Sequence, residues 1–146
     1  AIIPEVILNC LAGNPIKSTA GTQTREFNFV SNLVEAFIAA GEREAAVGEL
    51  INVGCGEEIA IRDLIALIHQ ETGSASELRI GELPDRPTEI WRMAADNSRA
   101  NELLGWSPKL SFRDGIRKSI DWYRQFQSIY NDVDSPLISL ARSASE

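Results

Sequence analysis

The chain has 146 residues, of which 44% are hydrophobic and 24% charged, and its net charge is −7 at pH 7. This composition suits a soluble domain with a hydrophobic core and argues against a disordered or fibrous chain. The acidic balance offers no basic surface for a nucleic-acid backbone. No apolar run approaches the roughly 20 residues of a membrane helix. We therefore expect a cytoplasmic protein with neither a nucleic-acid nor a membrane partner.

The two cysteines, Cys10 and Cys55, stand in apolar or glycine-rich surroundings without a CxxC spacing. This spacing supports neither a metal site nor a disulfide framework, so we expect reduced thiols. The chain also begins with Ala-Ile-Ile-Pro rather than Met, inside an apolar segment. We therefore expect it to be a piece of a longer protein.

Helices and strands are predicted to alternate from the start of the chain. A short helix over 6–12 ends at Gly13, and a short strand follows over 16–20. Residues 25–30 alternate in the manner of a strand, with three side chains on one side: Arg25, Phe27 and Phe29.

The next predicted helix begins at Asn32, a candidate N-cap, and ends at Gly41. Its side chains form an expected apolar stripe of Leu33, Val34, Phe37 and Ile38. After an acidic connection, residues 50–53 are predicted to form a strand that runs into Gly54-Cys55-Gly56.

A further helix is predicted over 61–72 with Gly73 as its stop, because apolar residues recur there at helical spacing: Ile61, Leu64, Ile65 and Ile68. Residues 78–80 are a candidate strand, and the prolines at 84 and 87 bound a turn.

A short helix is predicted over 100–104, and a longer one over 112–127 begins with a capping box of Ser111 and Asp114. The buried stripe of the longer helix is expected to be Ile116, Ile120 and Tyr123. From 131 onward the pattern fades into a Ser-rich tail. The sequence therefore predicts one domain of the α/β class, a small mixed α+β unit over 1–130, followed by a frayed tail over 131–146.

Two motifs are better explained by a structural role than by ligand binding or catalysis. The Gly54-Cys55-Gly56 turn follows a predicted strand, but a GxGxxG phosphate loop would need glycine at position 59, which is Ile59. The lone histidine, His69, falls on the polar side of its helix, and no carboxylate or serine stands at a spacing that would indicate general-base catalysis or metal binding. We therefore predict no metal site and no catalytic residue within the chain.

Three arginines have unusual positions in the sequence: Arg25 lies at a strand start, Arg86 between Asp85 and Pro87, and Arg92 six residues later. A guanidinium fork matches phosphate oxygens, so converging arginines can create a local anion site even in an acidic protein. The alternative is that Arg86, Glu89 and Arg92 are surface charges that pair with one another.

Five segments, taken in order, resemble the C-terminal part of extended short-chain dehydrogenase/reductases of the NAD-dependent nucleotide-sugar epimerase and dehydratase family. The segments are AIIPEVILNCLAGNPI, TQTREFNFVSNLVEAF, LINVGCGEEIAIRDLIALI, DRPTEIWRMAADNSRANELLGWSP and FRDGIRKSIDWYR. The resemblance implies the substrate-binding portion of a Rossmann-type enzyme whose N-terminal, NAD-binding half is absent.

The resemblance also implies roles for particular residues. Arg25 and Arg86 correspond to the arginines that contact the diphosphate of the sugar nucleotide, and Glu89 corresponds to an acidic residue that often meets the ribose. The strand over 16–20, with Ile16 and Lys17, corresponds to the edge that borders the nucleobase. Where the family usually has Asp and Ser or Thr at two cap positions, this chain has Asn32 and Ala60.

The family's catalytic Tyr-xxx-Lys pair is missing. The residues four positions after Tyr123 and Tyr130 are Gln127 and Asp134, so the chain by itself is expected to be inactive. The resemblance implies a role in a homodimeric NAD-dependent 4,6-dehydratase, in which C4 of the sugar is oxidised by hydride transfer to NAD. The alternatives are a 4-epimerase, or a non-catalytic nucleotide-binding or interaction module.

Overall fold

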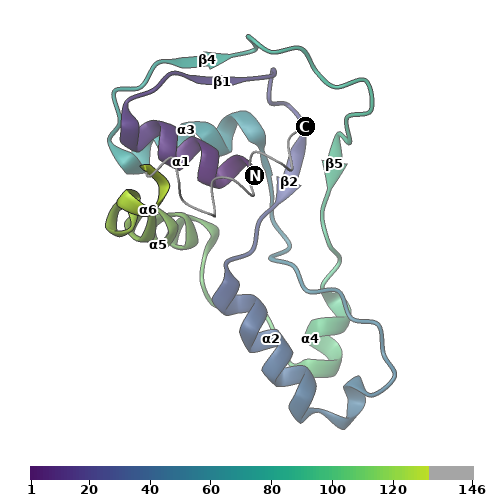
Figure 1. Cartoon of the computed structure of the whole chain (residues 1–146). Coiled ribbons are helices and arrows are strands. Elements are labelled where there is room, and N and C mark those ends of the chain that lie inside the picture. The colour runs from purple at the N-terminus through teal and green to yellow at the C-terminus, as the bar shows by residue number, and fades with distance from the viewer. Residues whose placement is uncertain (132–146) are drawn as a thin grey trace.

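The structure of the chain, a computed structural model, describes residues 1–131 (Figure 1). The predicted tail therefore lies outside the described residues, apart from its first position. In chain order the elements are α1 (Ile2–Ala12), β1 (Ile16–Ser18), β2 (Thr24–Glu26), α2 (Val30–Glu42), the 3-10 helix η1 (Glu44–Ala46), β3 (Glu58–Ala60), α3 (Ile61–Thr72), β4 (Leu78–Ile80), β5 (Arg92–Met93), α4 (Ser98–Leu104), α5 (Phe112–Gln125) and α6 (Gln127–Asn131).

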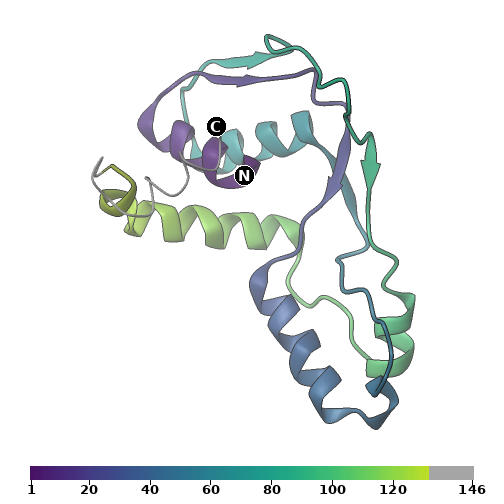
Figure 2. The same ribbon diagram turned by 45° about the vertical axis from the view of Figure 1, so that its right-hand side comes forward.

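The strands form two small sheets. β1 pairs in parallel with β4, with Ile16 opposite Leu78. β2 is the centre of the other sheet, antiparallel to β3 and parallel to β5. Figures 1 and 2 show β1 and β4 running above α1 and α3, while β2 and β5 descend side by side toward α2 and α4. β2 thus connects an upper lobe to a lower one.

The main core lies in the upper lobe, between α1, α3, α5 and β1. The apolar face predicted for α3 is confirmed, because all four of its members are buried: Ile61, Leu64, Ile65 and Ile68. The predicted stripe of α5 also packs into this core, with Ile116 and Ile120 buried and Tyr123 half-buried against it. Ser111 is the N-cap of α5 as predicted: the Asp114 N–H donates to Ser111 Oγ at 3.2 Å, and the hydroxyl in turn donates to Asp114 Oδ2 at 2.6 Å.

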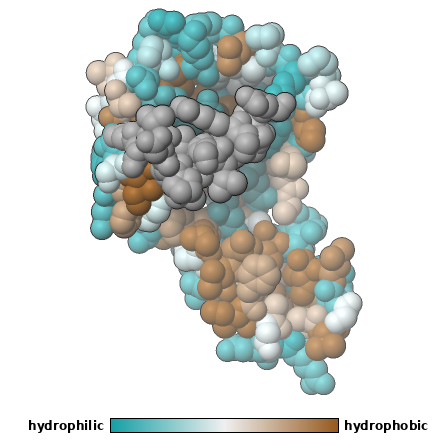
Figure 3. Space-filling model, in the orientation of Figure 1, coloured by the Kyte–Doolittle hydropathy of each residue, from teal (hydrophilic) through white to brown (hydrophobic). Residues whose placement is uncertain are grey.

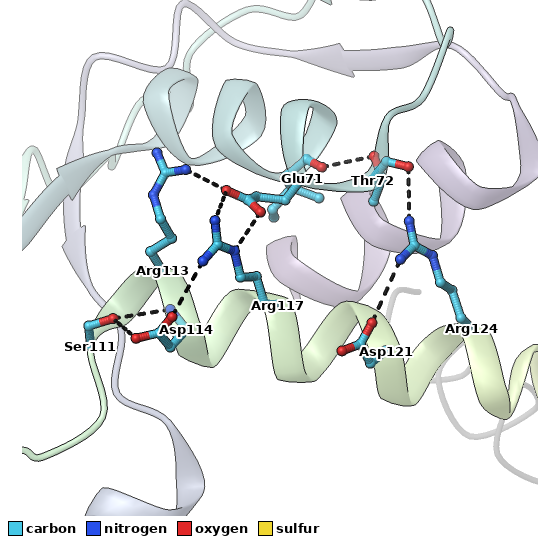
Figure 4. A network of polar contacts seen from close by, with 9 residues as sticks. Glu71, Thr72, Ser111, Arg113, Asp114, Arg117, Asp121 and Arg124 are labelled. Carbon is cyan, nitrogen blue, oxygen red and sulfur yellow. Dashed lines mark hydrogen bonds and ion pairs between the residues drawn. The ribbon is translucent and has the colours of Figure 1, made fainter.

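A polar network joins α3 to α5 along the edge of this core (Figure 4). The Glu71 carboxylate on α3 accepts hydrogen bonds from Arg117 Nε at 2.7 Å and from Arg113, both on α5. Only 11% of the Glu71 side chain is exposed. The hydrogen bond from Arg117 and the positive charges of Arg117 and Arg113 together lower the pKa of Glu71. The network therefore links α3 to α5 through ion pairs and hydrogen bonds.

The lower lobe has a smaller core, in which α2 packs on α4 through Ala36, Ala100, Leu104 and Trp106. The apolar stripe expected on α2 does not face this core: it points outward, and Phe37 is 71% exposed. The other members of the stripe are also exposed: Leu33, Val34 and Ile38. The side of α2 that packs inward carries the small Ala36 and the polar Asn32.

The predicted bounds of α2, from an N-cap at Asn32 to an end at Gly41, differ from the observed ones: the N-cap is Phe29, and the helix continues through Gly41 to Glu42. Asn32 instead lies inside the helix, 2% exposed, and binds the chain that leads into α5. Its Oδ1 accepts from the N–H of Leu110 at 3.0 Å, and its Nδ2 donates to the carbonyl of Leu110 at 3.0 Å. An amide can make both bonds, so Asn32 ties the lower lobe to the α5 entrance.

The strand predictions are partly correct. The strands over 16–20 and 78–80 exist as β1 and β4, but the strand expected over 25–30 is β2 and ends at Glu26. Residues 50–53 form no strand, and Leu50 is 85% exposed. β3 and β5 were not predicted because they are two or three residues long and alternate too briefly to show a period. Ala60 is the N-cap of α3 and makes no side-chain cap bond, as its methyl group requires.

The exposed stripe of α2 belongs to a larger apolar surface on the lower lobe. Figure 3 shows apolar residues gathered there, over the region of α2. Val47 and Leu50, in the connection that follows α2, are 79% and 85% exposed. Apolar patches of this kind mark surfaces that pack against something else.

Candidate functional site

An open cavity of about 420 Å³ lies between β1, β2 and the loop that follows β4. Four charged side chains that the sequence singled out line it: Lys17, Arg25, Arg86 and Glu89. Lys17 and Arg25 come from the consecutive strands β1 and β2, whereas Arg86 and Glu89 come from the loop after β4, far along the chain, and the fold brings them together. The wall also contains Gln23, Thr19 and Phe27.

Arg25 is held firmly at this cavity. Its position at the centre of β2 keeps the side chain mostly buried, with 19% exposed. Nη1 donates to the carbonyl of Thr24 at 2.7 Å, and Nη2 contacts Glu89 Oε1 at 2.6 Å. Glu89 is positioned by a turn in which its N–H donates to the carbonyl of Arg86 at 3.1 Å. The guanidinium is therefore pre-oriented by two fixed acceptors.

The other positive charges are less constrained. Lys17 Nζ contacts Glu82 at 2.5 Å, and the hydrogen bond from Lys17 lowers the pKa of Glu82. Arg86 is exposed and forms no ion pair with any of residues 1–131. Arg92 pairs with Glu58 at 2.8 Å instead of with Glu89. The alternative in which Arg86, Glu89 and Arg92 pair with one another therefore does not describe this structure.

Ile16 is placed differently from the other predicted site residues. Its side chain is 2% exposed and belongs to the main core, so it does not line the cavity. Gln23 was missed by the sequence reasoning, although it precedes Arg25 by two positions and so shares its side of the chain. That spacing was the available signal, but an uncharged residue just before a strand carries no mark of a phosphate ligand.

The Gly54-Cys55-Gly56 turn is occupied by a carboxylate of the protein itself. Glu26 Oε1 accepts from the N–H of Gly56 at 2.7 Å, and Oε2 accepts from the N–H of Ala95 at 2.5 Å. Burial raises the pKa of Glu26, but these backbone hydrogen bonds outweigh it and the pKa lies below its ordinary value. Because Glu26 takes the place that an anionic ligand would need, this turn does not suit a dinucleotide phosphate.

The described part of the chain gives little support to a metal site, a catalytic histidine or a reactive thiol. No group of three or more His, Cys, Asp and Glu side chains in residues 1–131 could hold a metal ion. His69 is engaged with the carbonyl of Ser76 at 2.9 Å. Both cysteines are free thiols, and burial raises the pKa of each. None of the helices between residues 1 and 131 is long and apolar enough to cross a membrane.

Comparison with known proteins shows the family of the chain. Residues 1–119 match the family model for GDP-mannose 4,6 dehydratase. The chain belongs to the NAD-dependent epimerase/dehydratase family. It is 36% identical over 125 residues to a UDP-glucose 4-epimerase of Mycolicibacterium smegmatis, a match that covers 85% of this chain and 38% of that protein. It is 37% identical over 131 residues to a dTDP-glucose 4,6-dehydratase of Xanthomonas campestris, covering 84% and 37% respectively.

The fold is likewise that of the epimerase/dehydratase family. The UDP-glucuronic acid 4-epimerase of Bacillus cereus, solved with UDP-glucuronic acid and NAD, superimposes with a TM-score of 0.77 and 30% identity. This match covers 86% of our chain and 40% of that one. The mixed α/β arrangement thus corresponds to part of a Rossmann-type enzyme. The chain spans about two-fifths of the length of the relatives it matches.

Proposed function

We propose that this chain is the substrate-binding portion of an NAD-dependent nucleotide-sugar 4,6-dehydratase, and that it holds the diphosphate of the substrate. The observation that carries the proposal is the convergence of Lys17, Arg25 and Arg86 on one cavity of a chain whose net charge is −7. Its relatives include both dehydratases and epimerases of nucleotide sugars, so a 4-epimerase is the second candidate.

In this proposal Arg25 and Arg86 each bind one of the two phosphates. Arg25 is rigid and half-enclosed, so it can fix the position of one phosphate with little loss of side-chain entropy. Arg86 is exposed and forms no ion pair with the described residues, so it can close on the second phosphate when the ligand arrives. Binding energy from the diphosphate would then position the sugar, which lies away from these contacts.

The reacting groups must come from elsewhere in this proposal. The sequence lacks a Tyr-xxx-Lys pair, and its glycine turn is filled by Glu26. The apolar surface of α2, with Val47 and Leu50, supports packing against a further segment of a longer enzyme. Residues 50–53 have the apolar pattern of a strand but no strand partner within residues 1–131, which also suits a sheet completed by that segment.

A binding experiment on the chain tests the diphosphate site. UDP, dTDP, GDP and CDP are titrated by calorimetry into the wild type and into Arg86→Ala, Arg25→Ala and Arg43→Ala. Loss of a charge-assisted phosphate contact is expected to weaken binding about tenfold or more in the first two variants. Arg43 lies at the far end of α2, outside this cavity, and serves as the matched control.

If Arg86→Ala binds all four nucleotides as tightly as the wild type, the diphosphate assignment is wrong. The distinction between dehydratase and epimerase needs the complete enzyme, supplied with a nucleotide sugar. Formation of a 4-keto-6-deoxy product would support the dehydratase, whereas recovery of the C4 epimer would favour the second candidate.

A further inference from the structure

The carboxylate of Glu26 joins three segments of the chain at one end of β2. Oε1 accepts from the N–H of Gly56, which leads into β3, at 2.7 Å, and Oε2 accepts from the N–H of Ala95, which follows β5, at 2.5 Å. Asn97 Nδ2 donates to the carbonyl of Gly54 at 3.2 Å and ties the glycine turn to the same segment after β5. We call these contacts the Glu26 clamp.

The glycine turn is shaped to accept this carboxylate. A Cβ added at Gly54 would lie 2.8 Å from the Cδ atom of Glu26 and closer still to Oε1, and it would also lie 2.8 Å from the Cβ atom of Ala95. Gly54 does not have a positive φ, so glycine is needed there for space alone. Gly56 has φ +76°, a conformation that favours glycine. The two glycines therefore form a receptor for the side chain of Glu26.

The pairing that holds Arg25 in the sheet is short. β2 and β5 run side by side in Figure 2, but only two residue pairs join them: Thr24 with Arg92, and Arg25 with Met93. A strand of two residues is below the usual length, and few ladder hydrogen bonds hold it in register. Glu26 follows Arg25 directly and binds the backbone just beyond β5. The clamp therefore closes this pairing at the end where the ladder stops.

The position of β5 also decides where the second arginine lies. Arg86 belongs to the loop that runs into β5, whereas Arg25 belongs to β2. If β5 shifted along β2, the loop with Arg86 would move relative to Arg25. The clamp opposes such a shift because it fixes Ala95 at the far end of β5. The spacing between the two guanidinium groups therefore depends on Glu26, although Glu26 does not line their cavity.

We propose that Glu26 is a positioning residue: held by the glycine turn, it sets the spacing between Arg25 and Arg86 so that both can bind one diphosphate. The inference rests on the proposed function, since it assumes that these two arginines hold the diphosphate. Contacts between a guanidinium and a phosphate depend on geometry, and a preorganised site loses less conformational freedom when the ligand binds. The glycine turn thus contributes to ligand binding without contact to the ligand.

Calorimetric titration of UDP into the 146-residue chain tests the clamp from both of its sides. Glu26→Gln replaces one acceptor oxygen by a donor group, which cannot accept from an N–H. Gly54→Ala displaces the carboxylate and leaves the charge of the chain unchanged. Each variant is expected to bind UDP about five- to tenfold more weakly. A pure charge effect of Glu26→Gln has the opposite sign, because it removes a negative charge from a chain of net charge −7.

Two variants serve as matched controls. Glu71→Gln also removes a carboxylate that accepts several hydrogen bonds, but this carboxylate lies between α3 and α5. Gly41→Ala adds a Cβ that meets nothing within 4 Å, at a glycine without a positive φ. Both controls are expected to bind UDP like the wild type. If Glu71→Gln weakens binding as much as Glu26→Gln does, a general loss of stability explains the effect and the inference is overturned.

A double-mutant cycle shows whether Glu26 acts through Arg25. In an Arg25→Ala background, Glu26→Gln should change UDP affinity by less than about twofold, because the guanidinium that it positions is gone. A purely structural role of Glu26 would weaken binding equally in both backgrounds. If the full loss persists in the Arg25→Ala background, the inference fails.

The outcomes separate this inference from the proposed function. If the wild type binds UDP and Arg25→Ala weakens binding, but Glu26→Gln and Gly54→Ala bind like the wild type, the positioning role alone fails. If the wild type does not bind UDP, or Arg25→Ala leaves its affinity unchanged, the diphosphate site is refuted and the inference falls with it. Circular dichroism of each variant reports its fold, and Gly54→Ala decides the test if Glu26→Gln does not fold.

Discussion

Replacing Asn32 by Ala tests the tie between the two lobes. The amide side chain is 2% exposed and makes four hydrogen bonds. Oδ1 accepts from the N–H groups of Lys109 at 3.2 Å and Leu110 at 3.0 Å, and Nδ2 donates to the carbonyl of Leu110 and to Asn28 Oδ1, both at 3.0 Å. Alanine leaves three backbone groups of 109–110 without these partners.

Each net hydrogen bond contributes about 1 kcal/mol, and three backbone partners give about 3 kcal/mol in total. That is a large part of the roughly 5–15 kcal/mol that stabilises a domain of this size. The melting temperature is therefore expected to fall by roughly 10 °C. Asn32→Asp keeps the two bonds that Oδ1 accepts but loses both bonds that Nδ2 donates, and it places a buried carboxylate oxygen against the Leu110 carbonyl and Asn28 Oδ1, so it should also destabilise the fold.

Urea unfolding followed by tryptophan fluorescence measures this cost, because Trp106 is buried in the lower-lobe core. Ser31→Ala is the control, since Ser31 is the exposed neighbour in the same helix and its loss should change the free energy of unfolding by less than about 0.5 kcal/mol. A cost below about 1 kcal/mol for Asn32→Ala would refute the view that this side chain connects the lobes.

Two further predictions concern stability. The pKa of Glu26 is lowered on folding, so its ionised form contributes stability that is complete above its unfolded pKa of about 4.3 and is lost as the pH falls through the lower folded value. In that acidic range, the urea midpoint of Glu26→Gln should therefore depend less on pH than the midpoint of the wild type. Equal pH dependence of the two midpoints would contradict this. Gly21 has φ +66°, and an added Cβ would lie 2.8 Å from the backbone nitrogen of Arg62, so Gly21→Ala should cost about 2–3 kcal/mol. Gly13 is the control, because it has φ +73° but open space around it, so Gly13→Ala measures the cost of the positive φ alone, about 1 kcal/mol. If the two substitutions cost the same, the close approach of residue 21 to Arg62 is unimportant.

The contrast between α3 and α2 shows how far periodicity predicts burial. Both helices carry apolar residues at helical spacing, and the sequence treats the two stripes alike. The α3 stripe is buried because α1 and α5 pack over it, whereas the α2 stripe, including Phe37, is exposed. Periodicity reveals that a helix has an apolar side, but what covers that side depends on elements distant in the chain.

The candidate site likewise combines features that the sequence indicates with contacts that only the tertiary structure shows. Arg25 and Arg86 could be selected from the sequence because a guanidinium in an apolar or proline-bounded setting is unusual. The ion pair between Arg25 and Glu89 could not, because 64 residues separate its partners and only the placement of β2 beside the loop after β4 joins them. Gln23 escaped notice because an uncharged side chain gives no such signal.

The sequence by itself determined the local elements with strong signals: the apolar face of α3, the Ser111 N-cap of α5 and the glycine stops at Gly13, Gly73 and Gly105. These depend on interactions between near neighbours, which spacing along the chain encodes directly. Only the tertiary structure decided that Asn32 joins two lobes, that Glu26 fills the glycine turn and that Glu89 faces Arg25. Those contacts link residues 30 or more positions apart, and no local period carries that information.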